Sequence, residues 1–372
     1  MRLRVAIAAA VMVAGCGPRA PAPPPKRPPL DPGLLKAWKR EFFDFAVALR
    51  MIGSGNAVDV QRGLDRAAGM APYEYFHWMT PGDQELVERA RKGDAAAVRE
   101  LARRGDVLDA VQSYAKPEDR SRWTPADRAR WDVARQRIVV AGPDMADYLA
   151  GVLASFLLQS SNAPVYREIR SQLVQLGKPG LQIVIAFMVT LADAAADTPI
   201  GRWDELVQVI AALAAFGDAG AEGVKAACES PKRYVRAAAA RAIAEAPAAA
   251  LSALVVKLLK DDREWEVRTA AAEALGNLRV GEKSCAPLLE VLGRERDALV
   301  VQKILLALGR AGCVDAVPKL INALEDPRME SSIRESAAEA LYDLTGLRMT
   351  KVAEWQKWYR NDYPAWRAKK KP

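Results

Sequence analysis

The sequence predicts an all-α protein, a right-handed α–α superhelix preceded by an irregular helical N-terminal region. Alanine and leucine dominate the 372 residues, and the alternation of β-branched residues that marks strands is scarce. Similar segments recur in the C-terminal half, and their closing apolar residues lie at positions 213, 243, 275, 308 and 341, in steps of 30, 32, 33 and 33. A repeat period in this range is typical of solenoids.

Residues 1–15 have the organisation of a secretory signal peptide. A cationic start precedes an uncharged apolar run over residues 5–13, which is too short to span a bilayer. Residues 13–16, Val-Ala-Gly-Cys, resemble the lipobox of bacterial lipoproteins, and the resemblance implies that Cys16 is lipidated and becomes the mature N-terminus. In that family Gly17 implies an outer-membrane lipoprotein that faces the periplasm or the cell surface. An ordinary signal peptide with an incidental cysteine is the alternative.

Residues 16–33 are rich in proline, which favours an extended polyproline conformation over helix or sheet. We expect this segment to be a tether that holds the folded body away from the membrane. A proline-rich ligand for adaptor domains is the alternative interpretation.

Residues 34–163 are predicted to form an irregular helical region that either continues the superhelix or caps it. Its expected amphipathic helices cover residues 34–50, 58–68, 84–91, 95–103, 125–140 and 144–158.

Residues 164–346 are predicted to contain the repeats, each a hairpin of two helices with Gly or Pro at the joints. The second helix carries a Val-Arg-x-x-Ala-Ala-x-x-Leu pattern, as in residues 267–275. This unit resembles the short HEAT repeats, including the subclass found in phycobilin lyases. The resemblance covers about half of the chain and implies a solenoid, but it says little about function, because the fold hosts many binding roles.

In the HEAT family, an acid in the turn and an arginine in the second helix form a structural ladder. The resemblance assigns this role to the acids Glu229, Asp261 and Asp326 and the arginines Arg236, Arg268 and Arg334. A ligand-binding row of arginines is the alternative. The repeat at 282–312 departs from the pattern, because Arg294 stands at the acid position and Val301 at the arginine position. We therefore expect the ladder to break there.

Residues 347–372 are predicted to be a C-terminal capping helix followed by a basic tail. Trp355 and Trp358 lie three residues apart, which puts both indoles on one helical stripe. This segment resembles the closing helix of bacterial HEAT proteins, although an aromatic ligand-binding patch is an alternative.

The formal net charge of +8 lies at the ends of the chain, in the signal segment, the tether and the tail, so the body is close to neutral. Nucleic-acid binding needs clustered Lys and Arg, so no nucleic-acid partner is expected. The basic ends are expected to touch anionic lipid headgroups instead.

Three cysteines remain beside Cys16, namely Cys228, Cys285 and Cys313. Their spacing leaves two possibilities open. In an oxidising compartment one pair forms a disulfide, whereas buried thiols are the common alternative in helical cores.

Catalytic chemistry is not evident in the sequence. His77 is the only histidine, so a Ser-His-Asp site or a His-based zinc site would depend on it. A histidine packed among the neighbouring aromatic residues is the simpler interpretation. We expect no catalytic residues, no metal and no cofactor. Phycobilin lyases and one class of alkylpurine DNA glycosylases use similar repeats, but neither activity suits an exported lipoprotein.

The predicted function is a non-enzymatic, lipid-anchored scaffold that binds a protein partner along the face of the second helices. Four equivalent exposed positions are the candidate contacts: Arg241, Glu273, Leu306 and Glu339. Leu306 is apolar where its counterparts are charged, which indicates a binding contact or an extra core residue. The alternatives are a structural component of an outer-membrane complex and an enzyme related to the HEAT-like lyases.

Overall fold

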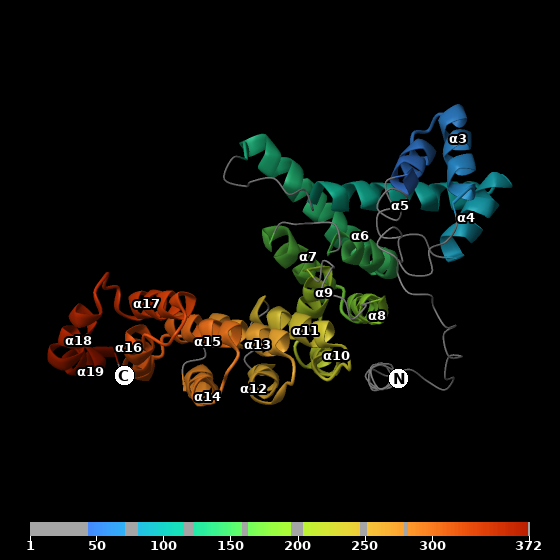
Figure 1. Cartoon of the computed structure of the whole chain (residues 1–372). Helices are drawn as coiled ribbons and strands as arrows, with labels where there is room; N and C mark the ends of the chain where they lie inside the picture. The colour runs from blue at the N-terminus through green and yellow to red at the C-terminus, as the bar shows by residue number, and fades with distance from the viewer. Residues whose placement is uncertain are drawn as a thin grey trace. The chain divides into compact units, whose positions relative to one another are not determined.

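The structure, a computed structural model, describes residues 44–70, 81–114, 123–157, 163–194, 204–245, 251–278 and 282–370. The predicted signal peptide, the tether, Cys16 and His77 lie outside these ranges. Every regular element in the described ranges is a helix, which confirms the all-α prediction (Figure 1). The chain divides into two compact units, with the division near residue 197.

The N-terminal unit begins with a helix over residues 44–53. It continues through α3 (Ala57–Ala68), α4 (Pro81–Arg91), α5 (Ala95–Tyr114), α6 (Pro125–Leu157), α7 (Ala163–Gln175) and α8 (Lys178–Ala194). α6 bends at Met145 and packs against α5, α7 and α8. The buried Tyr114 joins these helices, because its hydroxyl lies 2.9 Å from a carboxylate oxygen of Glu168 on α7 and its ring stacks on Trp131 of α6.

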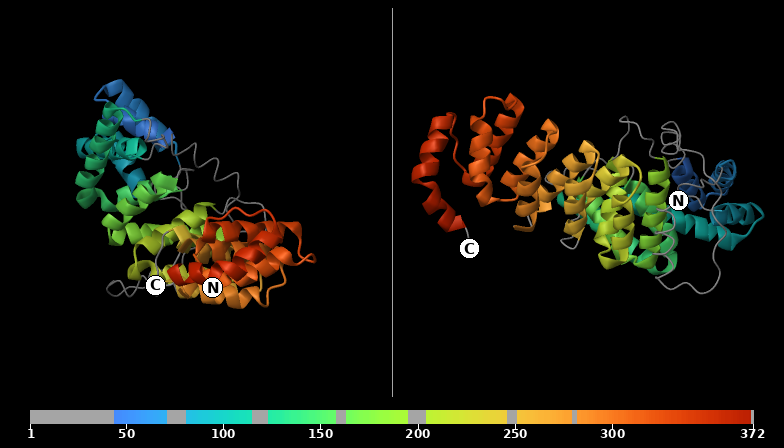
Figure 2. Two further views of the ribbon diagram at one scale, coloured as in Figure 1. Left: turned by 90° about the vertical axis from the view of Figure 1, so that its left-hand side faces the viewer. Right: turned by 60° about the horizontal axis from the view of Figure 1, so that its bottom comes forward.

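The C-terminal unit is the repeat array. Its helices are α9 (Asp204–Ala215), α10 (Asp218–Cys228), α11 (Arg233–Glu245), α12 (Ser252–Asp261), α13 (Trp265–Leu278), α14 (Glu282–Leu292), α15 (Ala298–Arg310), the 3₁₀ turn η3 (Val314–Ala316), α16 (Val317–Glu325), α17 (Ser331–Thr345), α18 (Val352–Asn361) and α19 (Tyr363–Lys370). From α10 to α17 they alternate as first and second helices of hairpins. The second helices α11, α13, α15 and α17 lie side by side in one layer (Figures 1 and 2), as a solenoid requires.

Small residues let the second helices approach closely. Ala239, Ala271 and Ala337 are fully buried between them, consistent with helix axes at the short end of the 8–10 Å packing range. Glycine is required at two of these contacts. A Cβ on Gly276 would lie 2.8 Å from the Cα of Ala307, and one on Gly309 would lie 2.7 Å from the Cα of Ala340.

The last two helices lie at the end of the array. α18 packs on α16 and buries Trp355 and Trp358, whose rings meet edge to face at 5.8 Å. The Trp355 indole N–H donates to the Met349 carbonyl at 3.3 Å. From α19, Arg367 forms an ion pair with Asp315 at 2.7 Å. Both tryptophans therefore fill the interior instead of forming an open aromatic patch.

Candidate functional site

The four candidate contact residues occupy the same position on successive second helices: Arg241 on α11, Glu273 on α13, Leu306 on α15 and Glu339 on α17. We call them the second-helix column. Arg241 and Glu339 are exposed, whereas Glu273 and Leu306 are half-buried. The column thus presents a positive charge near one end, a negative charge at the other and an apolar side chain between them.

Polar contacts between neighbouring helices flank this column. The Lys303 ammonium lies 4.0 Å from the Glu273 carboxylate, so the charge of Glu273 is already shared with the next repeat. One turn away, the Gln302 amide donates to the Ser332 hydroxyl at 2.9 Å. Sequence reasoning missed Lys303 and Gln302, because neither belongs to the recurring motif. These two contacts link side chains of neighbouring repeats beside the column.

Two arginines of the predicted ladder bridge successive repeats. Arg236 holds Asp262 with two hydrogen bonds, of 2.6 and 2.9 Å, and Arg268 holds Glu295 with two, of 2.7 and 3.1 Å. Each guanidinium also donates to two turn carbonyls, as Arg236 does to Ser230 and Pro231. Because these groups are largely buried, the arginines fix the stacking of repeats and are not available to a ligand.

The acids of this ladder differ from those expected. Asp261 is the last residue of α12, and the acid that binds Arg236 is the next residue, Asp262, whose extended backbone turns it toward α11. Glu229 instead lies 3.9 Å from Lys257, and Asp326 binds Arg328 within its own turn.

The ladder also extends one step further than expected. Arg268 finds an acid in the deviant repeat, because Glu295 follows Arg294 directly. Val301 then cannot continue the ladder to the following turn. Arg334, on the last second helix, has a buried Nε without a hydrogen bond.

One disulfide joins the array. Cys285 on α14 is bonded to Cys313, which follows α15, so the bridge links the first helix of one repeat to the start of the next. Cys228 is the free cysteine of the described residues, and burial raises the pKa of its thiol to about 12. Such a thiol is inert at neutral pH.

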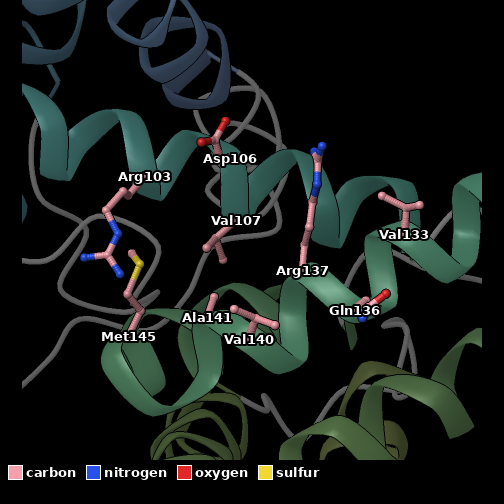
Figure 3. Close-up of a pocket in the computed structure, with 9 residues that line it drawn as sticks. All are labelled: Arg103, Asp106, Val107, Val133, Gln136, Arg137, Val140, Ala141 and Met145. Carbon is pink, nitrogen blue, oxygen red and sulfur yellow. The ribbon is translucent and has the colours of Figure 1, made fainter.

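A groove opens between α5 and the first half of α6 in the N-terminal unit (Figure 3). Its volume is about 600 Å³. Val133 and Val140 on α6 are 51% and 72% exposed. In the view of Figure 3 Arg137 lies between these valines, whereas Arg103 lies near Met145. The valines are seven residues apart, a spacing that in sequence indicates a core stripe, so this surface could not be recognised in advance. The lining also includes Asp106 and Gln136, so the groove combines apolar side chains with polar groups and charges of both signs.

In the parts of the chain that the structure defines, no three His, Cys, Asp or Glu side chains gather as metal ligands. None of the described helices has the length and apolar composition needed to cross a membrane.

Comparison with known families identifies HEAT repeats over residues 221–309 and a PBS lyase HEAT-like repeat over residues 301–326. The predicted repeat type is confirmed for this part of the chain, which is a helical repeat scaffold. No curated protein matches the sequence. Among solved structures, human deoxyhypusine hydroxylase in complex with glycerol shares 16% identity, with 71% of this chain and 93% of that chain covered, at a TM-score of 0.25. A likeness this low carries no argument about activity.

Proposed function

We propose that this protein is a non-enzymatic scaffold that binds a protein partner across the second-helix column, while a lipid on Cys16 holds it in the cell envelope. Two features support the proposal. The layer of second helices is continuous over successive repeats, and the column on this layer carries charge of both signs around the half-buried Leu306. Such a surface recognises a partner by area, shape and charge pattern.

Two features support the envelope placement. The Val-Ala-Gly-Cys segment at residues 13–16 resembles a lipobox. Independently, the Cys285–Cys313 bond suits an oxidising compartment, since structural disulfides are rare in reducing ones. We place the body on the periplasmic side of the outer membrane on these grounds.

Site-specific photo-crosslinking in cells tests the binding role. A photoreactive residue is introduced at Arg241 or Glu339 in the full chain, and the matched control is the exposed Lys283 on the first helix α14. The proposal expects a discrete crosslinked species from both column positions and none from Lys283. Absence of crosslinks at both column positions, or equal crosslinks at all three, would refute it.

The anchor has a separate test. Palmitate labelling of the wild-type chain should place label on the protein, and Cys16→Ala should abolish it.

A permanent structural role in an outer-membrane complex would instead give crosslinks at fixed stoichiometry that persist through purification.

A further inference from the structure

The arginine–acid ladder has a gap between the last two repeats, and the gap lies on the arginine side. Asp326 follows α16 in the same extended conformation that Asp262 has after α12, with φ and ψ of −71° and 109° against −74° and 137°. Asp262 accepts two hydrogen bonds from Arg236, whereas Val301 stands at the corresponding place on α15. Asp326 instead binds Arg328 of its own turn. The acid of this ladder step is therefore in position, and a valine occupies the place of its arginine.

The Cys285–Cys313 disulfide spans the same interval of the array. Cys285 lies on α14, in the repeat that contains Val301. Cys313 lies between α15 and η3, at the start of the repeat that contains Asp326. The two preceding pairs of repeats are joined by the ladder arginines. The covalent bond thus joins the two repeats between which the ladder is interrupted.

The turn that begins at Cys313 also holds the last helix of the chain. The Tyr363 hydroxyl donates to the Val314 carbonyl at 3.3 Å, and Arg367 forms its ion pair with Asp315. Both contacts come from α19, and α18 packs on α16. The disulfide therefore fixes the turn on which the C-terminal helices rest.

The polar contacts across the interrupted step are single hydrogen bonds. The Gln302 amide donates to the Ser332 hydroxyl at 2.9 Å, and the Lys319 ammonium donates to the Leu289 carbonyl at 3.2 Å. A two-pronged bond between guanidinium and carboxylate is stronger than either, because both partners are charged. Packing between α15 and α17 does not depend on the disulfide. Loss of the bond should therefore cause local opening of the end of the array rather than unfolding of the whole unit.

We propose that the Cys285–Cys313 disulfide takes the place of the missing ladder step and acts as an oxidation-dependent lock on the end of the array. With the bond closed, α16–α19 are held to α14 and α15. With the bond open, α16–α19 undergo local opening as a separate unit, while the ladder still holds α11, α13 and the turn before α15 together.

The lock closes and opens by thiol–disulfide exchange. On closing, the two thiols together lose two protons and two electrons and form the S–S bond, and a disulfide oxidant takes them up and leaves as two thiols. A dithiol reverses the reaction and is itself oxidised to a disulfide. Cys285 is half-buried and Cys313 is only 2% exposed, so the dithiol attacks the sulfur of Cys285 and Cys313 leaves as the thiolate.

The position of the lock also affects the second-helix column. Glu339 lies on α17, beyond the disulfide, whereas Arg241 lies on α11. On the proposed scaffold function, which this consequence presupposes, a partner that contacts both residues must order α16–α19 when it binds the open form. Such a partner therefore binds the closed form more tightly.

Native-state hydrogen exchange of the full chain with Cys16→Ser tests the lock. Protection of the amides in α16–α19 is compared with that in α11–α13 for the oxidised protein, for the protein reduced with dithiothreitol and for Cys285→Ser. We expect both open forms to lose protection at least about ten-fold in α16–α19, with a change below about two-fold in α11–α13. Dithiothreitol should have no further effect on Cys285→Ser.

A second variant separates the lock from the general effect of a crosslink. Val301→Arg in the Cys285→Ser background supplies the missing arginine opposite Asp326 and should recover most of the lost protection in α16–α19. Val301→Met is the matched control, because its side chain is long but uncharged, and it should recover none.

Three results would overturn the proposal: unchanged protection of α16–α19 after reduction, an equal loss in α11–α13, or no greater recovery with Val301→Arg than with Val301→Met. Crosslinking from Arg241 and Glu339 tests the scaffold function separately. If those crosslinks form while the exchange results are negative, only the lock is wrong.

Discussion

Arg268 and Glu295 form a two-pronged ion pair between successive repeats, with Nε to Oε2 at 2.7 Å and Nη2 to Oε1 at 3.1 Å. The remaining guanidinium nitrogen donates to the carbonyls of Asp262 and Arg263. The side chains are only 17% and 8% exposed, so little water is available to replace these bonds. This pair therefore couples the α12–α13 hairpin to the turn before α15.

Truncation of this arginine should destabilise the repeat unit. Arg268→Ala leaves the Glu295 carboxylate and two carbonyls without their donor, which costs about 2–3 kcal/mol in the free energy of unfolding. Urea unfolding followed by circular dichroism measures the loss. Arg328→Ala is the matched control, because the Arg328–Asp326 pair has the same chemistry on an exposed surface and should leave the unfolding midpoint unchanged.

The same pair predicts a pH dependence. Burial alone raises the pKa of Glu295, but hydrogen bonds from Arg268 and from the backbone N–H groups of Asp297 and Arg296 outweigh it, and the pKa lies below its usual value of 4.5. The folded state thus favours the charged form. The resulting stability is present above pH 4.5 and is lost as pH falls through the folded pKa. Glu295→Gln should be less stable than the wild type near pH 7 and should lose less stability on acidification. Equal acid sensitivity of the two proteins would contradict this assignment.

Because the second helices approach closely, one added methyl group at Gly276 or Gly309 should destabilise the fold. Gly276→Ala and Gly309→Ala should each lower stability by about 1–3 kcal/mol, although alanine favours helix formation by about 1 kcal/mol. The added Cβ meets the backbone of the next helix, which cannot move aside as a flexible side chain would. Gly53→Ala is the control, since its Cβ would lie 3.8 Å from its nearest neighbour. Thermal unfolding should therefore give lower midpoints for Gly276→Ala and Gly309→Ala than for Gly53→Ala.

The disulfide predicts a redox-dependent stability. Breaking a bridge that spans 28 residues removes about 3.5 kcal/mol in the loop-entropy model. Cys285→Ser should therefore unfold at lower denaturant concentration than the wild type and should not respond to reductant. In a Cys16→Ser background, denaturing alkylation without reductant should modify Cys228 alone. Modification of all three remaining cysteines would show that the bridge does not form.

The sequence was informative wherever a residue type recurs at the repeat period. Ala239, Ala271 and Ala337 and the motif arginines define the second helices and their stacking, so the solenoid was predictable. Asp261 and Asp262 show the limit, because two adjacent acids satisfy the same pattern. The choice between them depends on where α12 ends and on the extended backbone of Asp262, which is a three-dimensional property.

The candidate surfaces were less predictable for a related reason. Val133 and Val140 have the spacing of a core stripe, so the sequence gives no sign that they line an exposed groove. The Cys285–Cys313 pair depends on which two of three cysteines the superhelix brings together, and spacing alone left this open.

The most direct test of the second-helix column asks whether changing its charges alters a crosslink that forms from a neighbouring residue. A photoreactive residue is placed at the exposed Asn277 on α13, and the crosslinked species is quantified in cells for the wild-type column, for Arg241→Glu with Glu339→Arg, and for the first-helix control Lys283→Glu. If the column binds the partner, reversal of its charges reduces the crosslink about ten-fold, whereas the control leaves it unchanged. A crosslink of undiminished yield in the charge-reversed chain would contradict the role of the column.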